Sequence, residues 1–136
     1  MRILGIDYGD KKIGLAFGDS DAGVAVPLDV VPNNGEETIL IFSEKAKSED
    51  INLIVVGVPL STGEHHDGVQ LEKTRKFISS LREVVEIPVK EQDESFTTAD
   101  SIRLQKEDGA TADEDALAAM LIIKSYFARI TEVTSD

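Results

Sequence analysis

The sequence contains no cysteine and no tryptophan. Without cysteine the chain can form neither a disulfide framework nor a thiolate metal site, which fits a reducing compartment. It has no run approaching 18 apolar residues, and its N-terminus lacks the basic and apolar segments of a secretory signal. We therefore predict a cytoplasmic protein without membrane association.

Basic residues are also scarce. The chain has 14 lysines and arginines against 26 aspartates and glutamates, a formal net charge of -12. This balance argues against a general nucleic-acid coat, because lysine and arginine drive phosphate binding by releasing counterions. Aromatic residues are only 5% of the chain, too few for a platform that stacks single-stranded bases. A nucleic-acid enzyme whose carboxylates hold divalent metal remains compatible with this composition.

What the chain does contain is typical of a soluble globular domain. Of its 136 residues, 41% are hydrophobic and 29% charged. This length is enough for an independent core and too short for two typical domains. The sequence has no internal repeat, low-complexity segment or linker. We expect one domain over residues 1–136.

The order of apolar patterns predicts an α/β fold. Three segments separated by turn residues indicate an antiparallel meander. The continuous apolar run INLIVVGV is typical of a central parallel strand that is buried on both faces. The whole pattern predicts a mixed five-stranded sheet, three antiparallel strands followed by parallel ones, flanked by helices. The predicted strands are 3–7, 12–18, 23–31, 51–58 and 87–92, and the predicted helices are 37–48, 69–85, 98–106 and 114–130.

Two of these helices show a predicted inner face. For the helix at 37–48 the inner residues are Ile39, Leu40, Phe42 and Ala46. For the helix at 114–130 they are Leu117, Met120, Leu121, Ile123 and Phe127. The second face is most simply core, although a surplus on it would suit a homodimer, so the sequence leaves monomer and homodimer open.

Acidic residues fall where the predicted parallel strands end. Asp7 ends the first strand, Asp93 and Glu94 follow the fifth, and the acidic run 113–115 begins the last helix. In an open α/β sheet, ligands bind beyond the carboxyl ends of the strands. A carboxylate at the end of a core strand is costly unless it has a partner or acts on a ligand. The pattern therefore predicts a site at this edge of the sheet.

Four stretches resemble the successive motifs of one family. They are GIDYGDKKIGLAFGD, IVVGVPL, DESFTTADS and DALAAMLIIKSYF. In this order and spacing they resemble the YqgF/RuvX family, described as Holliday junction resolvases and as nucleases that mature the 5′ end of small-subunit ribosomal RNA. The resemblance covers nearly the whole chain. It implies a ribonuclease H-like fold and metal-dependent hydrolysis of phosphodiester bonds in structured RNA or branched DNA, with ribosomal precursor particles as further partners.

The resemblance also implies site residues. The catalytic and metal-binding carboxylates of the family fall on Asp7, Glu94 and Asp115, with Asp93 as an alternative ligand. They would hold Mg²⁺ or Mn²⁺ in a two-metal site, because hard cations prefer oxygen ligands and two ions can stabilise both the attacking and the leaving oxygen. The family arginine after the acidic pair is Ser95 here, which removes a bidentate partner for phosphate.

Further residues are candidates for binding substrate. Gly9 lets the turn after the first strand approach phosphate closely. Hydroxyl groups that follow the acidic pair can bond phosphate or cap the next helix. Lysines and an arginine can form a local basic face in spite of the negative total, because salt screens each charge beyond about 8 Å. The candidates are Gly9, Lys11, Lys12, Thr97, Thr98, Lys73, Arg75 and Lys76.

Two alternative functions stay open at this point. GIDYGDKKIGLAF also resembles the first phosphate motif of the actin and sugar-kinase superfamily, which implies nucleotide binding, although that superfamily needs a second domain to close over its ligand. The other alternative is a non-catalytic module that binds nucleic acid, the ribosome or a transcription partner, which the net charge of -12 and Ser95 favour.

Overall fold

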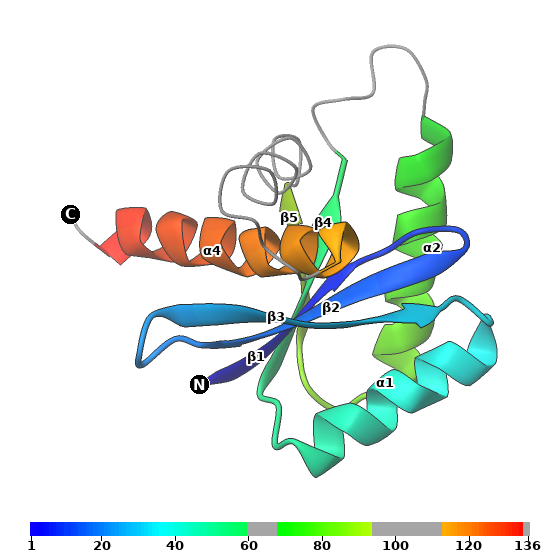
Figure 1. Ribbon diagram of the computed structural model, residues 1–136, viewed down its shortest axis with the longest axis horizontal. Coiled ribbons are helices and arrows are strands. Elements are labelled where there is room, and N and C mark those ends of the chain that lie inside the picture. The colour runs from blue at the N-terminus through cyan, green and yellow to red at the C-terminus, as the bar shows by residue number, and fades with distance from the viewer. Residues whose placement is uncertain (60–67, 94–112, 135–136) are drawn as a thin grey trace.

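The computed structural model describes residues 1–59, 68–93 and 113–134 (Figure 1). The predicted helix at 98–106 lies outside these residues. Among the described helices, none is long and apolar enough to cross a membrane. The elements in chain order are β1 (Arg2–Asp7), β2 (Lys12–Asp19), β3 (Val24–Pro32), α1 (Glu36–Ser48), β4 (Leu53–Val58), α2 (Gly68–Val84), β5 (Val89–Asp93) and α4 (Glu114–Thr134).

The described strands form one sheet in the order β3-β2-β1-β4-β5. β2 is antiparallel to both β1 and β3, whereas β4 is parallel to both β1 and β5. The predicted mixed five-stranded sheet is therefore confirmed. The main differences lie at the ends of elements: β4 begins at Leu53 rather than at residue 51, and α4 continues to Thr134 rather than ending at residue 130.

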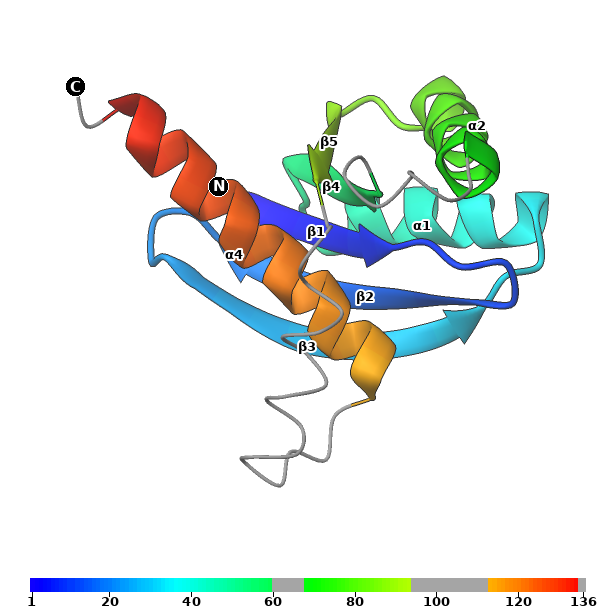
Figure 2. The same cartoon turned by 90° about the horizontal axis from the view of Figure 1, so that it is seen from above.

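Helices cover the two faces of the sheet unequally. α1 and α2 lie on one face and α4 crosses the other, as Figures 1 and 2 show. Strand residues alternate between these faces, so each face has its own apolar cluster. In β1, for example, Leu4 and Ile6 pack toward α1 and α2, and Ile3 packs toward α4. Each fully buried side chain of this size contributes roughly 1.5–3 kcal/mol.

The inner face of α1 differs from the prediction at one position. Leu40 is 56% exposed, so its assignment to the core was wrong. Thr38 and Ser43 are buried instead, on the same face as Phe42 and Ala46. The hydroxyl of Thr38 donates to the carbonyl of Pro32 at 3.0 Å. This polar side chain is buried because its hydrogen bond joins the start of the helix to the end of β3.

α4 packs unusually close to the sheet because small residues lie beneath it. A Cβ atom on Gly5 would lie 2.6 Å from Cγ1 of Ile123, and a Cβ on Gly18 would lie 2.7 Å from Cγ2 of the same side chain. Both distances are shorter than a van der Waals contact. Glycine in a strand weakens the strand itself, but here it lets the helix approach. This close packing fixes where α4 begins, and hence where its first carboxylates lie.

Candidate active site

Asp7 ends β1 on the face that α4 covers. Leu4 and Ile6 pack on the opposite face, so the alternation of the strand places Ile3, Gly5 and Asp7 together under α4. Asp7 is half-buried. A carboxylate at this position lies between the core and the region beyond the end of the strand.

The N-terminus of α4 lies against the residue that pairs with Asp7. In the sheet register Asp7 is opposite Gly14 of β2. A Cβ atom on Gly14 would overlap the carbonyl oxygen of Asp115, so the first turn of α4 lies directly on this glycine. The backbone of Asp115 is therefore one strand away from Asp7. The fold brings together these two predicted site residues.

Asp113 fixes this helix start. Its carboxylate accepts a hydrogen bond from the backbone N–H of Asp115 at 2.9 Å, and its carbonyl accepts one from the N–H of Leu117. This is the geometry of an N-cap. The carboxylate of Asp113 thus caps the helix, and that of Asp115 pairs with a residue of β2.

Lys12 makes that pair. Its Nζ lies 3.2 Å from Oδ2 of Asp115, and the two side chains are 59% and 30% exposed. The hydrogen bond to Asp115 is the main reason why the pKa of Lys12 is raised. A pair this exposed adds little stability. Its main consequence is that a cation already occupies one oxygen of Asp115.

Asp93 lies on the other face of the sheet. Val89 packs into the cluster beneath α1 and α2, and Glu91 pairs with Arg75 of α2. The alternation of β5 places Asp93 on this same face, away from Asp7. The other predicted residues of this region, Glu94, Ser95, Thr97 and Thr98, lie outside the described residues.

Gln92 is a residue that the sequence analysis missed. It lies on the α4 face of β5 and is 9% exposed, and its Oε1 has no hydrogen-bond partner. An unsatisfied buried acceptor costs about 1–3 kcal/mol. The signal in the sequence was a glutamine two positions before Glu94, at a place where the alternation of the strand puts its side chain under a helix.

The turn after β1 is held by the end of β3. Asn33 donates from its side chain to the carbonyl of Gly9 at 2.8 Å, and its backbone N–H donates to the carbonyl of Lys11 at 2.9 Å. A Cβ atom on Gly9 would approach the carbonyl oxygen of Lys12 to 2.5 Å, so this tight turn requires glycine. Lys11 and Lys12 are both exposed. The turn therefore presents two lysines beside Asp7.

The three basic residues of α2 that are candidates for substrate binding fall into two groups. Arg75 binds both carboxylate oxygens of Glu91, at 3.0 and 3.1 Å, and this pair raises its pKa. Lys73 lies 3.4 Å from the exposed Asp10. Lys73 and Lys76 line a hollow of about 200 Å³ beside Tyr8. These two lysines face the region of the turn after β1, whereas Arg75 fastens α2 to β5.

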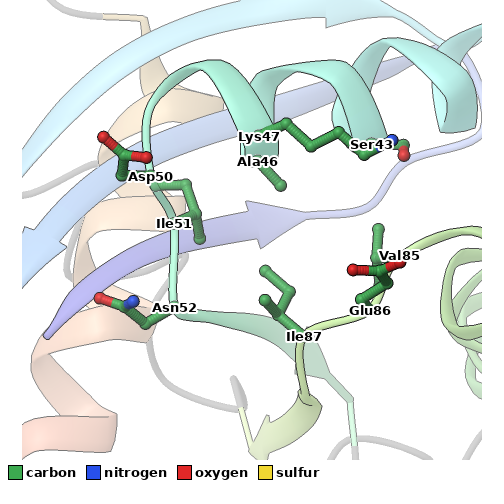
Figure 3. A pocket seen from close by; sticks show the side chains of 9 residues that line it. All are labelled: Ser43, Ala46, Lys47, Asp50, Ile51, Asn52, Val85, Glu86 and Ile87. Carbon is green, nitrogen blue, oxygen red and sulfur yellow. The ribbon is translucent and has the colours of Figure 1, made fainter.

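A larger hollow lies at the other end of the sheet. It has a volume of about 320 Å³ and lies between the end of α1 and the segment before β5. In Figure 3 the side chains of Ala46 and Ile87 point toward each other across it. The parallel strands begin here, whereas ligands of open sheets bind where such strands end. None of the predicted site residues lines this hollow.

Within the described residues, no three histidine, cysteine, aspartate or glutamate side chains are grouped so that they could hold a metal ion. The described part of the site thus supplies two carboxylates, Asp7 and Asp115, on one face of the sheet. The strand order of the sheet and the helices that cover it (Figure 1) are those of a ribonuclease H-like fold.

Comparisons with known proteins agree with this class. The family model described as "RuvX: Holliday junction resolvase" matches residues 1–129. The chain is 36% identical to a protein of Endomicrobium trichonymphae over 92% of this chain and 94% of the relative, and 33% identical to one of Syntrophus aciditrophicus over 97% and 91%. Both relatives carry the name "Putative pre-16S rRNA nuclease".

Solved structures show the same fold. RuvC of Thermus thermophilus in complex with a Holliday junction substrate has a TM-score of 0.59 to this chain at 16% identity, covering 96% of each chain. A second structure of that protein gives the same TM-score at 17% identity, covering 96% of this chain and 97% of that one. The chain belongs to the RuvX family. The predicted fold and the predicted class of enzyme, a nuclease that hydrolyses phosphodiester bonds, are confirmed at the level of this family.

Proposed function

We propose that this chain is a metal-dependent nuclease that hydrolyses the precursor of small-subunit ribosomal RNA. The observation that carries the proposal is the placement of Asp7 beside the first turn of α4, which brings Asp115 onto the same face of the sheet. The relatives named as nucleases of pre-16S rRNA are 30–36% identical over most of the chain. The junction resolvase structures share only 16–17% identity, so they support the fold and not the substrate.

The donor set fits a hard divalent cation. Asp7 and Asp115 offer carboxylate oxygens, which Mg²⁺ and Mn²⁺ prefer. We assign Glu94, which lies outside the described residues, as the third ligand in preference to Asp93, because Asp93 lies on the face of α1 and α2, opposite to that of Asp7. The bound ions would activate water and neutralise the leaving oxygen.

The residues of this chain have separate tasks around that chemistry. Asp7 would lie at the centre of the metal site. Its strand, β1, lies between β4 and β2, and α4 begins against β2. Lys12 neutralises Asp115 while no metal is bound and is then available for a phosphate oxygen. The turn at Gly9 allows the backbone to approach the substrate strand. Lys73 and Lys76 would hold phosphates further along the nucleic acid without contacting the metal.

The decisive experiment is cleavage of precursor 16S rRNA and of a four-way DNA junction with Mg²⁺ or Mn²⁺. We expect the parent protein to cut the RNA precursor and to cut the junction more slowly. Parent protein that cuts neither substrate with either metal, while its melting temperature shows that it is folded, would favour the non-catalytic binding module.

We expect that replacing both Lys73 and Lys76 by glutamine will weaken binding of the RNA precursor about tenfold. The salt dependence should also fall, since each lost phosphate contact lowers the slope of log K against log salt by about 0.7–0.9. The matched control replaces Lys45 and Lys47, which lie in the last turn of α1 at the far end of the sheet. Filter binding at several salt concentrations measures both effects. An equal loss in the control pair would mean that only net charge matters.

Lys12→Met should change metal and RNA binding in opposite directions. Removing the ammonium next to Asp115 removes a competing positive charge, so the affinity for Mg²⁺ should rise roughly threefold. RNA binding should weaken, because a phosphate partner is lost. Lys11→Met is the control, because it removes the same charge from the neighbouring exposed residue. Calorimetric titration measures metal affinity, and weaker metal binding in Lys12→Met would mean that Lys12 holds Asp115 in place.

A further inference from the structure

The side-chain amide oxygen of Gln92 is buried and has no hydrogen-bond partner within the described part of the chain. Among the described residues it is the one whose buried side-chain oxygen accepts no hydrogen bond. Its side chain is more than nine-tenths buried. A native structure rarely keeps such a group without a reason, because leaving it unsatisfied costs stability. The position of the group in the sheet suggests what that reason is.

The register places Gln92 in one row with Asp7. Gln92 of β5 is opposite Gly57 of β4. Ile6 of β1 is opposite Val56, so the next residue of each strand, Asp7 and Gly57, continues the same row. Gly57 contributes no side chain between the other two. The Cα atoms of Asp7 and Gln92 are thus two strand spacings apart, about 9.5 Å.

The two side chains also share a face. Val89 and Glu91 lie on the face of α1 and α2, so Lys90 and Gln92 lie on the α4 face, as Asp7 does. Lys90 is exposed, and Gln92, nearer the end of the strand, is buried. Apart from Tyr126, the side chains that α4 buries over the sheet are apolar, and among the described residues none donates a hydrogen bond to Oε1 of Gln92. A ligand bound beyond the ends of the strands can supply the missing donor.

We propose that Gln92 is a positioning residue of the metal site: its amide oxygen accepts a hydrogen bond from a water molecule that a divalent cation retains at Asp7 and Asp115. This inference rests on the proposed function. Mg²⁺ keeps several of its waters when proteins bind it, and those waters are strong donors. Partners in this outer layer orient the ligands, and losing one typically lowers metal affinity 10–100-fold. Gln92 would orient the metal-bound water on the side of the site nearest β5.

The test uses Gln92→Met, which keeps the length of the side chain and removes the amide. In EDTA this variant should melt at or above the parent temperature, because an unsatisfied acceptor has been removed. The concentration of Mg²⁺ or Mn²⁺ that gives half of the thermal shift should rise 10–100-fold. Gln92→Glu restores an oxygen at the same place, so the metal concentration that gives half of the thermal shift should return to the parent value or fall below it. Neither readout depends on cleavage.

Two outcomes overturn the inference. If Gln92→Met melts well below the parent in EDTA and keeps the parent metal midpoint, Gln92 is a structural residue. If the methionine variant does not fold, Gln92→Asn replaces it, because it keeps the amide and withdraws it by one methylene. If Gln92→Asn reaches half of its thermal shift at the same metal concentration as the parent, the inference is overturned as well.

Asp7→Asn is titrated in parallel to separate the two proposals. If Asp7→Asn loses the metal response and Gln92→Met keeps it, only the role of Gln92 is wrong. If Asp7→Asn keeps the response, the metal site of the proposed function is wrong, and the inference fails with it.

Discussion

Asp7→Asn is expected to lower nuclease activity at least 100-fold and, in EDTA, to melt at or above the parent temperature. Asp7 lies one strand from Asp115, so folding brings two carboxylates onto one face of the sheet, and the exposed Lys12 offsets only part of their repulsion until a metal ion binds. Active sites commonly sacrifice stability in this way. Asparagine keeps the shape and removes one charge, which relieves the repulsion and removes a metal ligand.

The metal response is the second part of the same expected result. A cation that binds only the folded protein stabilises it by RT ln(1 + [L]/Kd), about 2.7 kcal/mol at a hundredfold excess over Kd. Added Mg²⁺ or Mn²⁺ should therefore raise the melting temperature of Asp7→Asn less than that of the parent. Thermal melts with EDTA and with metal, beside a cleavage assay, measure all three quantities.

Asp10→Asn is the matched control for that variant. Asp10 is an exposed residue in the turn after β1, and its described partner is Lys73 at 3.4 Å. The control removes the same charge three residues away and should keep activity within about threefold. If instead Asp7→Asn melts far below the parent in EDTA and gains as much from metal, Asp7 is a structural aspartate. Breaking a buried pair would then cost roughly 3–5 kcal/mol.

The sheet could be predicted from the sequence because apolar periodicity is a local signal. The alternation of Ile13, Leu15 and Phe17 fixes one face of β2, and all three residues pack toward α1 and α2. The continuous run of β4 is buried on both faces, as expected for a central parallel strand. Element ends were less predictable, because they depend on contacts such as the hydrogen bond from Thr38 to Pro32.

The candidate site residues stay a prediction, but the structure shows where some of them lie. The strand-end pattern pointed to Asp7 and the family resemblance to Asp115, and the fold places both on one face of the sheet. The sequence did not decide between Asp93 and its neighbour, because that choice depends on which face β5 turns toward α2. The pairing of Glu91 with Arg75 shows which face of β5 lies toward α2, and the assignment of Glu94 as the ligand stays a proposal.

Pairing between distant residues explains the remaining differences. The basic residues of α2 look alike in the sequence, but Arg75 is engaged by Glu91, 16 positions along the chain. The sequence offered no reason to select Gln92, because a single glutamine in a strand is common and its importance depends on its surroundings. The structure shows both that Oε1 of Gln92 has no hydrogen-bond partner among the described residues and that the sheet register places Gln92 in the same row as Asp7.

Gly14→Ala is expected to lower both the stability and the activity by large amounts. The added Cβ would overlap the backbone carbonyl of Asp115, and a helix backbone cannot move aside as a flexible side chain can. Overpacking costs typically 1–3 kcal/mol and occasionally more, so we expect about 3 kcal/mol here. For a chain of this size that corresponds to a fall in the melting temperature of roughly 10 °C.

The effect on activity follows from where the overlap occurs. Relief of the overlap requires the first turn of α4 to move away from β2, which carries the carboxylate of Asp115 away from Asp7. A displacement of 1 Å at a catalytic group can lower the rate about 100-fold, so activity should fall even at temperatures where the variant is fully folded. Metal-induced stabilisation should fall with it.

Gly68→Ala provides the control, because a Cβ atom at Gly68 would meet no atom within 4 Å. It should leave activity and metal response unchanged and alter stability only slightly, since alanine is the better helix former. Gly18→Ala is the sharper comparison. Its Cβ would also press on α4, but against the flexible side chain of Ile123, far from Asp115. If Gly14→Ala loses stability like Gly18→Ala but keeps full activity in its folded state, the position of Asp115 over β2 is not what the catalytic site depends on.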